Sequence, residues 1–453
     1  MIEAENVYIG FGKAAKTLAF KQASRGESVV VIEESDQMYG GTCINIACIP
    51  SKFLYEMSTK PKVGGSEGDN YKTVVLNKKA TIAKLRNSNL HKLVDQPTIK
   101  LLNARASFSD AHTLDIVYGN GQTDQVVGQR IFINTGAHPN IPDINGLGND
   151  PHLVTSTELL DQERLPKSLV IIGGGFIGME FATTFSQFGS QVTIINRHDS
   201  LVANFDEDVA QIIQQNFDQL GVRVLNGTQV TNVTDNGAYS TLSINSVNGA
   251  EQLVADTILV ATGRSANIDG LNLEKAGISF NNRGVIVDKQ LKTNVDGVWA
   301  MGDVRGGSQF TFISLDDYRI VFNQLYGDAS KTTDEQELVP HTVFLNPPLS
   351  QIGLSEREAK RLGVNYRIGK VPVAGMPKAH ILGNTSGFYK VLVGEDDQII
   401  GATLLAPEAH EVINIISLAM HARLPYQYLR DQIYAHPTMA EGLNDAFEMI
   451  NPV

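Results

Sequence analysis

The sequence predicts an α/β protein in which two strand–turn–helix–strand units come first and an α+β portion comes last. Three observations support this fold class. Apolar segments of strand length run into glycine-rich turns near residues 10 and 173, and each turn is followed by a helical segment and another apolar strand. From about Leu338 the pattern changes to alternating strands and helices. The 453 residues are enough for about three domains.

The first unit has the order of elements that is typical of a dinucleotide-binding fold, with the turn Gly10-Phe-Gly12-Lys-Ala-Ala15. Gly10 allows the tight turn, Gly12 lets the backbone approach a pyrophosphate, and Ala15 is small where the helix packs on the strand. Glu33 at the end of the second strand can accept hydrogen bonds from an adenosine ribose. The elements are a strand at Val7–Gly10, a helix to about Arg25 and a strand at Ser28–Ile32.

The second unit repeats this order around Gly173-Gly-Gly175-Phe-Ile-Gly178, so the chain is expected to bind two dinucleotides. Its elements are a strand at Leu169–Ile172, a helix to about Phe188 and a strand at Gln191–Ile195. Further strands are predicted at Leu242–Val247, at Leu253–Val260 and in Gly297–Asp303, which ends on an acid.

The C-terminal portion carries no dinucleotide turn and is predicted to be α+β. Its expected antiparallel strands are Val371–Val373, Phe388–Val393 and Ile399–Leu405, followed by helices at about His410–Ala422 and Ala440–Met449. The polar, glycine-rich segment Pro61–Asn70 is expected to be a loop.

Composition excludes several classes of partner. The net charge of −12 and the pI of about 5.3 argue against nucleic acid or an anionic membrane. The apolar runs are of strand length, far below the roughly 18 residues of a spanning helix. No signal peptide is visible, so we expect the chain to stay in the reducing cytoplasm. The ten histidines have no metal-ligand spacing, so no resident metal site is predicted.

Cys43 and Cys48 are the only two cysteines, and they lie between Gly40-Gly41 and Pro50-Ser-Lys52. Cysteines this close in a reducing compartment indicate redox or metal chemistry. A helix is predicted to start at Thr42 or Cys43, and the helix dipole is expected to lower the thiol pKa there. Residues five apart in a regular helix have Cα atoms about 8.7 Å apart, beyond the about 7 Å limit for a disulfide. The helix should therefore be distorted when the pair is oxidised, and a strained disulfide is easily reduced.

With these motifs the chain resembles the class I pyridine nucleotide–disulfide oxidoreductases, which include glutathione reductase, lipoamide dehydrogenase and mercuric reductase. The resemblance covers nearly the whole chain. It rests on GxGxxA with Glu33, GGTCxNxxCxPSK at 40–52, GGGFIGMEFA at 173–182, ATGR at 261–264, WAMGD at 299–303 and HPTMAE at 436–441. The spacing CxNxxC between Gly-Gly and Pro-Ser-Lys is highly specific.

The resemblance implies a flavin, a nicotinamide coenzyme and a role for each matching residue. Cys48 would be the flavin-proximal, charge-transfer thiol, and Cys43 would be the outer thiol that meets the acceptor. Lys52 would lie beside the flavin and pair with Glu180. His436, oriented by Glu441, would act as acid–base in the partner subunit's site, so the active enzyme would be a homodimer. FAD would be bound by Gly10, Gly12, Ala15, Glu33, Gly41, Thr42, Lys52, Thr135, Gly136 and Asp303, and NAD(P)H by Gly173, Gly175, Gly178, Arg197 and Gly263.

The resemblance also implies the domain boundaries. We expect a discontinuous, Rossmann-like FAD-binding domain at 1–147 and 265–335, a Rossmann-like NAD(P)H-binding domain at 148–264 and a dimerisation domain at 336–453. It suggests cis peptide bonds at Asn346–Pro347 and His436–Pro437.

The identity of the acceptor stays open at this point. Three stretches, 309–321, 344–350 and 424–443, resemble bacterial reactive-chlorine-resistance flavoproteins, a Cu(II)-reducing branch of the family, so Cu(II) is the first expectation. Cys43 would then be a transient soft ligand. The alternatives are a small-molecule disulfide and a redox sensor with little turnover. Asp316 and Asp317 belong either to a repacked flavin-side helix with a solvated acidic face or to a metal-capture site.

The coenzyme preference is predicted from the end of the strand Gln191–Ile195. An acid there would repel a 2′-phosphate, but this chain has Asn196 followed by Arg197, which can pair with a phosphate. NADPH is therefore expected to be preferred over NADH. A second arginine found in NADPH-specific relatives is replaced by Ala203, so the preference need not be strict.

Overall fold

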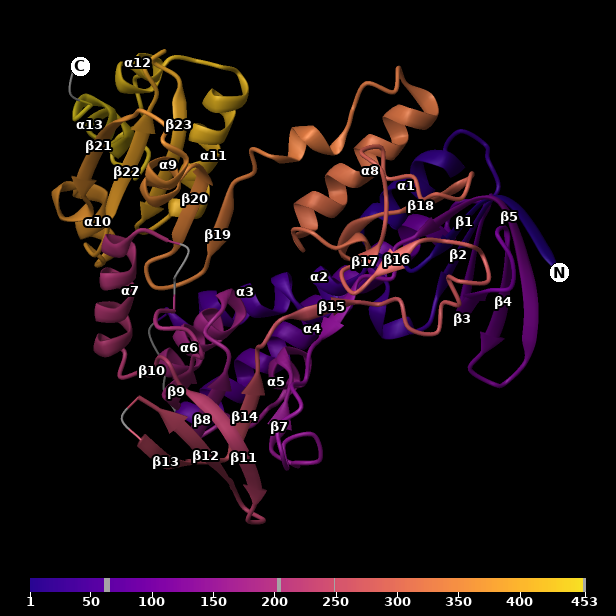
Figure 1. The fold of residues 1–453 in the computed structure, drawn as a ribbon, viewed down its shortest axis with the longest axis horizontal. Helices are drawn as coiled ribbons and strands as arrows, with labels where there is room; N and C mark the ends of the chain where they lie inside the picture. The colour runs from indigo at the N-terminus through magenta and orange to yellow at the C-terminus, as the bar shows by residue number, and fades with distance from the viewer. Residues whose placement is uncertain (61–65, 202–204, 248, 451–453) are drawn as a thin grey trace. The chain divides into compact units, whose positions relative to one another are not determined.

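The computed structural model describes residues 1–60, 66–201, 205–247 and 249–450. It divides into two compact units, each built from three stretches of chain (Figure 1). The first unit comprises Met1–Pro142, Val154–Arg164 and Thr262–Gln336, and the second comprises Asp143–Leu153, Leu165–Ala261 and Glu337–Val453. The predicted α/β fold class with a C-terminal α+β part is confirmed.

A mixed sheet forms the centre of the first unit. Its parallel strands run in the order β3-β2-β1-β5-β18, and β4 joins β3 to β5 by antiparallel pairing. The strands are β1 (Ile2–Ile9), β2 (Val29–Glu33), β3 (Ile99–Phe108), β4 (Thr113–Tyr118), β5 (Thr123–Ile133) and β18 (Val298–Ala300). Because parallel strands place their carboxyl ends at one edge, the glycine turn after β1, Glu33 and the segments after β5 and β18 meet there.

Two helices, α1 (Lys13–Ala23) and α8 (Thr311–Tyr326), pack on one face of this sheet. Alanines and Leu18 of α1 meet Ile320 and Val321 of α8 around Phe132 and Trp299 from the strands. Strand positions alternate between the two faces, and the other face is filled by residues such as Val30, Leu114 and Ile131. The predicted first strand, helix and second strand are thereby confirmed, with β1 beginning five residues earlier than expected.

Helices α2 (Thr42–Ile46), α3 (Cys48–Ser58) and α4 (Glu67–Val94) stand between β2 and β3 in the chain. Helix α5 (Ser156–Asp161) comes later and also belongs to the first unit. Helix α4 corrects the predicted loop at 61–70, of which residues 61–65 lie outside the described part of the chain. Ser66 caps α4 by accepting a hydrogen bond from the Asp69 N–H at 3.2 Å, and acids occupy the first turn. This capping makes the polar segment a helix start.

The second unit contains a parallel sheet in the order β10-β9-β8-β14, to which β7 (Leu153–Val154) is added. Its elements are β8 (Ser168–Ile172), α6 (Phe176–Phe188), β9 (Gln191–Ile195), α7 (Glu207–Gln219), β10 (Arg223–Leu225) and β14 (Thr257–Val260). The predicted strand bounds of the second glycine unit are confirmed at β9. The single strand expected at Leu253–Val260 is wrong, because Asp256 separates β14 from β13, an antiparallel strand of another sheet. That three-stranded sheet contains β11 (Gln229–Asp235), β12 (Ser240–Ser246) and β13 (Gly249–Ala255).

The C-terminal part of the second unit is a five-stranded antiparallel sheet in the order β19-β20-β23-β22-β21. The predicted α+β pattern is confirmed, with β22 (Phe388–Val393) and β23 (Ile399–Leu405) at their expected bounds. The other elements are β19 (His341–Val343), β20 (Leu349–Gly353), α9 (Glu356–Leu362), β21 (Arg367–Pro372), α10 (Pro377–Leu382), α11 (Ala409–His421), α12 (Tyr426–Arg430) and α13 (Gly442–Glu448).

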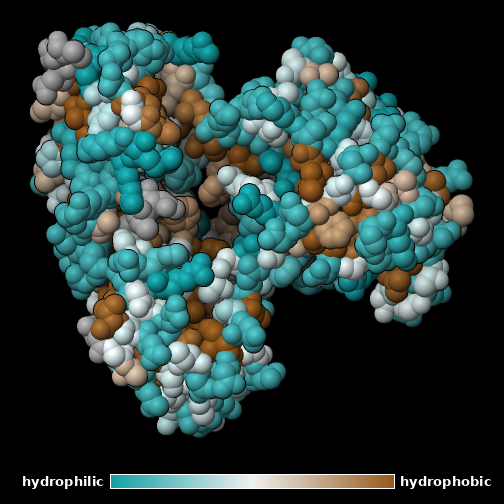
Figure 2. Space-filling view, in the orientation of Figure 1, coloured by the Kyte–Doolittle hydropathy of each residue, from teal (hydrophilic) through white to brown (hydrophobic). Residues whose placement is uncertain are grey.

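Short strands and turns complete the fold. They are β6 (Ala137–Pro139), β15 (Arg264–Ala266), β16 (Phe280–Asn281) and β17 (Gly284–Val285), with 3-10 turns at Asp36–Met38, Gly302–Arg305, Thr333–Gln336 and Val373–Gly375. None of the helices in the described part of the chain has the length and apolarity that crossing a membrane requires. Figure 2 shows a face covered mainly by hydrophilic residues, with smaller hydrophobic patches.

Helix α8 carries Asp316 and Asp317, and the structure corrects the expectation of a solvated acidic face. The Asp317 side chain is fully buried and accepts from the Gly302 N–H at 2.7 Å and from Arg305 Nε and Nη2 at 2.8 and 2.9 Å. Asp316 faces Lys331 at 3.7 Å and is partly exposed. Asp317 therefore holds the turn after β18 against α8, and within the described residues no group of three or more potential ligands could hold a metal ion.

Replacing Asp317 by alanine should destabilise the protein much more than the same change at Asp316. The Asp317→Ala change leaves the largely buried Arg305 guanidinium without its carboxylate partner, which costs about 3–5 kcal/mol. Loss of the partly exposed ion pairs of Asp316 should cost about 1 kcal/mol or less. Urea unfolding of the flavin-loaded variants measures both. Equal losses in the two variants would contradict this role for Asp317.

Candidate active site

The two cysteines lie at a break between two helices. Helix α2 begins at Thr42, as predicted, and ends at Ile46, while α3 begins at Cys48. Ala47 between them has φ −140° and ψ −103°, outside the helical region. The distortion predicted from the five-residue spacing is therefore present, because a continuous helix would hold the two residues too far apart.

Both cysteines are present as thiols and both are half-buried. A hydrogen bond with Cys48 and burial raise the pKa of Cys43 well above its usual value. The expectation of a lowered pKa at the helix start is wrong for Cys43 in this dithiol state, because the hydrogen bond with Cys48 and burial outweigh the helix dipole. Thr311 at the start of α8 lies next to both cysteines, with its Oγ1 3.5 Å from Cys48 Sγ.

The glycine turn and the redox segment are in close contact. Gly41, with φ +88°, lies so near the first unit's turn that a Cβ there would be 2.8 Å from the Gly12 Cα. Gly12 is packed in turn against the Asn134 side chain. Asn134, which sequence reasoning missed, follows β5, accepts from the Ala15 N–H at 3.2 Å and donates to the Met301 carbonyl at 2.5 Å. Gly12, Ala15 and Gly41 are thus brought together as predicted.

The buried side chain of Asn45 fixes the turn around Cys43 from inside the motif. Its Nδ2 donates to the Gly41 and Tyr39 carbonyls at 2.9 and 3.1 Å, and its Oδ1 accepts from Arg86 Nε at 2.8 Å. Arg86 lies on α4, a helix that the sequence analysis did not anticipate. The asparagine of CxNxxC was the available signal, since a buried amide needs several partners.

A lysine next to the same segment was also missed. Lys16 of α1 donates to the Gly40 carbonyl at 3.0 Å and to Asn89 Oδ1 of α4 at 2.7 Å. Burial lowers its pKa to about 8. Helices α1 and α4 therefore hold the first glycine of the redox segment through one ammonium group.

The residues expected to hold FAD offer groups that fit it. Glu33 accepts from the Phe11 N–H at 2.9 Å, and burial raises its pKa. Burial also raises the pKa of Asp303, and within the described residues no hydrogen bond engages its carboxylate, so it can accept from a flavin hydroxyl. Gly136 faces Thr42, with a Cβ position 3.8 Å from the Thr42 Oγ1, and Thr135 Oγ1 donates to the Asn267 carbonyl at 2.7 Å.

The second glycine turn lies between β8 and α6, as predicted. Gly175 is the N-cap of α6, and Gly178 packs against the Gly173 carbonyl with no room for a side chain. A helix N-terminus with open space at Gly175 suits a pyrophosphate. Gly263, also expected at this site, belongs to the first unit, where its carbonyl accepts from the Asn140 N–H at 2.9 Å.

Asn196 and Arg197 follow β9 and differ in exposure. Asn196 is buried, and its Nδ2 donates to the His198 carbonyl at 3.0 Å and to Asn226 Oδ1 at 2.8 Å. Arg197 is exposed, with its Nε 3.3 Å from His198 Nε2. Arg197 is thus accessible to a ligand, while Asn196 shapes the loop. Ala203 lies outside the described residues.

Lys52 and Glu180 lie in different units. Lys52 is on α3 and half-buried, and Glu180 is on α6, where its Oε1 accepts from the Phe344 N–H at 3.0 Å. Their predicted pairing stays a prediction.

His436 and Glu441 form the predicted pair. His436 Nδ1 is 2.8 Å from Glu441 Oε2, and Oε1 of the same carboxylate accepts from the Thr438 N–H at 3.1 Å. The hydrogen bond from His436 lowers the pKa of Glu441. The His436 side chain is 69% exposed, so its Nε2 can meet another molecule. The predicted cis bonds at Asn346–Pro347 and His436–Pro437 are confirmed.

The chain matches known families along nearly its whole length. Residues 5–317 match the family of pyridine nucleotide-disulphide oxidoreductases, and residues 339–447 match the dimerisation domain of that family. The probable pyridine nucleotide-disulfide oxidoreductase RclA of Escherichia coli is 41% identical, over 99% of this chain and 100% of the relative. A mercuric reductase of Staphylococcus aureus is 32% identical, over 96% of this chain and 80% of the relative.

A solved structure is also similar. It is the Cu(II) complex of the HOCl-induced flavoprotein disulfide reductase RclA from Escherichia coli, with a TM-score of 0.93, 40% identity and full coverage of both chains.

Gly41→Ala should abolish stable flavin binding, whereas Gly26→Ala should not. Both glycines have a positive φ, of +88° and +85°, but only at Gly41 does a Cβ meet a neighbour, the Gly12 backbone, while nothing lies within 4 Å of it at Gly26. Each change carries a similar backbone strain of about 1–2 kcal/mol, so the difference reports the close approach. Flavin absorbance per protein after purification measures it, and equal retention in both variants would contradict the steric argument.

Proposed function

The chain belongs to the pyridine nucleotide-disulphide oxidoreductase family, and we propose that it carries electrons from NADPH to Cu(II) through FAD and the pair Cys43–Cys48. Membership makes it a flavin- and pyridine nucleotide-dependent enzyme with a redox disulfide. The observation that carries the metal proposal is the whole-chain similarity to a flavoprotein disulfide reductase solved with Cu(II). The proposal adds this acceptor and the roles of individual residues.

Bound FAD would supply the hydride chemistry with the reduced nicotinamide and the electron transfer to a disulfide. The chain's residues prepare that transfer. Glu33 would accept hydrogen bonds from the adenosine ribose of FAD and Asp303 from a hydroxyl of its ribityl chain. Gly12 has no side chain that would keep the pyrophosphate away from the backbone. In this proposal Lys52 places a positive charge near the flavin ring and is oriented by Glu180.

The reduced cysteine pair then passes its electrons to the acceptor. Reduction of the disulfide consumes two electrons and leaves Cys48 as a thiolate and Cys43 as a thiol that has taken one proton. Cys43 is the outer sulfur and a soft ligand, so it meets the metal ion and loses its proton on binding. One electron passes to each of two Cu(II) ions, two Cu(I) ions leave and the disulfide re-forms.

His436 and Glu441 favour a second candidate acceptor, a small-molecule disulfide. Splitting a disulfide releases a thiolate that needs a proton, and the exposed imidazole held 2.8 Å from Glu441 suits this role. In the proposed homodimer this pair completes the partner's site. Exposed apolar side chains of the dimerisation domain support an association surface: Leu418, Tyr428 and Ile433.

NADPH is proposed as the preferred coenzyme. The exposed guanidinium of Arg197 can pair with a 2′-phosphate, and Asn196 presents no charge that would repel it. We further propose that the enzyme works in the cytoplasm in cell redox homeostasis under reactive chlorine stress, since the similar solved flavoprotein is described as HOCl-induced.

Substitutions should separate the two acceptors. If Cu(II) is the acceptor, Cys43→Ser and Cys48→Ser lower Cu(II)-dependent NADPH oxidation severely, while His436→Ala lowers it modestly because no leaving group is protonated. If a disulfide is the acceptor, His436→Ala costs on the order of 10²–10⁴-fold. Steady-state assays of FAD-loaded dimers with Cu(II) and with oxidised glutathione measure both. The metal proposal fails if Cu(II)-dependent oxidation does not exceed that of the Cys43→Ser protein, and little turnover with every acceptor would favour a redox sensor.

Arg197→Ala should raise the KM for NADPH by about tenfold, since one charged hydrogen bond is worth about 1.5–3 kcal/mol. The KM for NADH should change little, because NADH has no phosphate at that position. Lysine at position 197 keeps the charge and should retain most of the preference. Equal effects on the two coenzymes, or a preference of the unmodified enzyme for NADH, would count against the proposal.

A further inference from the structure

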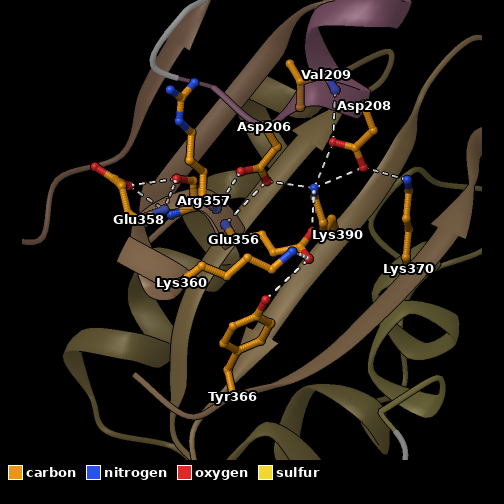
Figure 3. A network of polar contacts seen from close by, with 11 residues as sticks. Asp206, Asp208, Val209, Glu356, Arg357, Glu358, Lys360, Tyr366, Lys370 and Lys390 are labelled. Atoms are coloured by element: carbon orange, nitrogen blue, oxygen red, sulfur yellow. Dashed lines mark hydrogen bonds and ion pairs between the residues drawn. The ribbon is translucent and has the colours of Figure 1, made fainter. Parts of the chain in front are cut away.

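The second unit contains a buried ionic network that the proposed chemistry does not use (Figure 3). Lys390 of β22 is at its centre, with a side chain only 2% exposed. Its Nζ lies 2.6 Å from Asp206, 2.8 Å from Asp208 and 3.3 Å from Glu356. Burying an ammonium group with three carboxylates carries a desolvation penalty, and removing one partner is more unfavourable because it leaves buried charge uncompensated.

The carboxylates come from two different parts of the second unit. Asp206 is the N-cap residue of α7, the helix between β9 and β10 in the chain, and Asp208 lies in its first turn. Glu356 begins α9 of the dimerisation domain. Asp206 Oδ1 also accepts from the Arg357 N–H at 2.8 Å, so one buried carboxylate ties the start of α7 to both α9 and Lys390.

Asn196, which follows β9 directly before Arg197, packs against the second glycine turn, since a Cβ at Gly174 would be 2.9 Å from the Asn196 Cβ. The glycine turn and the residues at the end of β9 are therefore in contact.

An aromatic contact holds the start of α7 from a second side. Phe205, directly before Asp206, is buried and lies 6.0 Å from the Phe176 ring and 6.4 Å from the His341 ring, measured between centroids. Phe176 is the first residue of α6 after Gly175, and it stacks on His341 of β19 at 6.2 Å. His341 of the dimerisation domain therefore contacts both the start of α6, where the coenzyme is expected to bind, and the residue directly before Asp206.

We infer that Lys390, although it lies in the dimerisation domain, is a positioning residue for NAD(P)H binding that acts through Asp206 and Phe205 on the start of α6 at the second glycine turn. This inference rests on the proposed function, since it assumes that the coenzyme binds at the second glycine turn. Without the ammonium group, Asp206, Asp208 and Glu356 repel one another, and the start of α7 loses its attachment to β22. Phe205 is then no longer held against Phe176, the first residue of α6 after Gly175.

Lys370 provides a matched control in the same network. It lies on the neighbouring strand β21, and its Nζ is 2.6 Å from Asp208. Its side chain is 43% exposed, and among the described residues it forms no ion pair with Asp206. Lys370→Met removes an equal charge at the rim of the network, while Lys390→Met removes it at the centre. Asp206→Asn is a milder second variant, because an amide oxygen can still accept from Arg357 while the charge is lost.

The experiment measures NADP⁺ and NAD⁺ binding to the oxidised, FAD-loaded dimer by calorimetry, together with KM, kcat and the midpoint of thermal unfolding. Lys390→Met and Asp206→Asn should weaken NADP⁺ binding by about threefold to thirtyfold, the range for residues that act on a site through intervening contacts. The KM for NADPH should rise in parallel while kcat at saturation and flavin content stay near those of the unmodified enzyme. Lys370→Met should change binding by less than about twofold.

Coenzyme affinity that is unchanged while thermal stability falls would overturn the inference, because the network would then only hold the fold together. Equal weakening of coenzyme binding by Lys370→Met would overturn it too, since loss of any positive charge in the network would then explain the effect. If Lys390→Met does not fold, Asp206→Asn decides alone, and normal affinity in that variant rejects the inference. Failure of the coenzyme proposal is distinguishable, because it shows as an NADH preference of the unmodified enzyme, in which case NAD⁺ is the probe.

Discussion

The close approach of Gly41 to Gly12 is the contact on which the rest of the active site depends. It places the turn before Cys43 directly on the glycine turn that opens α1, where a Cβ on Gly41 would lie 2.8 Å from the Gly12 Cα. This approach requires that residue 41 has no side chain, and Gly12 has no room for one either, because a Cβ there would meet the Asn134 side chain. Asn134 accepts a hydrogen bond from the Ala15 N–H, and Asn45 donates one to the Gly41 carbonyl. The same set of contacts therefore holds the thiols and the expected flavin site.

The break in the helix at Ala47 brings the two cysteines together. A regular helix would hold them too far apart, but here Cys43 lies on the short helix α2 and Cys48 begins α3. The hydrogen bond with Cys48 and burial raise the pKa of Cys43, which disfavours a reduced pair with two negative charges. A soft metal ion would displace the proton of Cys43, whereas a disulfide acceptor would need a separate acid, and this difference in proton supply is what distinguishes the two candidate acceptors.

Much of the fold could be predicted because its signals are local. Glycine turns between apolar strands marked both nucleotide units, and β9, β22 and β23 have their predicted bounds. Helix α4 was missed because its buried face, at Tyr71, Val74, Val75 and Ile82, is interrupted by Lys78, which is buried through a 2.7 Å ion pair with the distant Asp161. The burial of Asp317 and the supports given by Asn134 and Arg86 depend on residues far away in the chain, so no local pattern could reveal them.

The central claim is that Cys43 and Cys48 carry the electrons between the flavin and the acceptor. An anaerobic thiol count on the FAD-loaded enzyme tests it most directly, because the chain has only two cysteines. Starting from the oxidised enzyme, stoichiometric NADPH should make two thiols per subunit reactive, and subsequent Cu(II) should remove both as Cu(I) forms. Cu(I) formation from an enzyme whose thiol count does not change at either step would contradict the account.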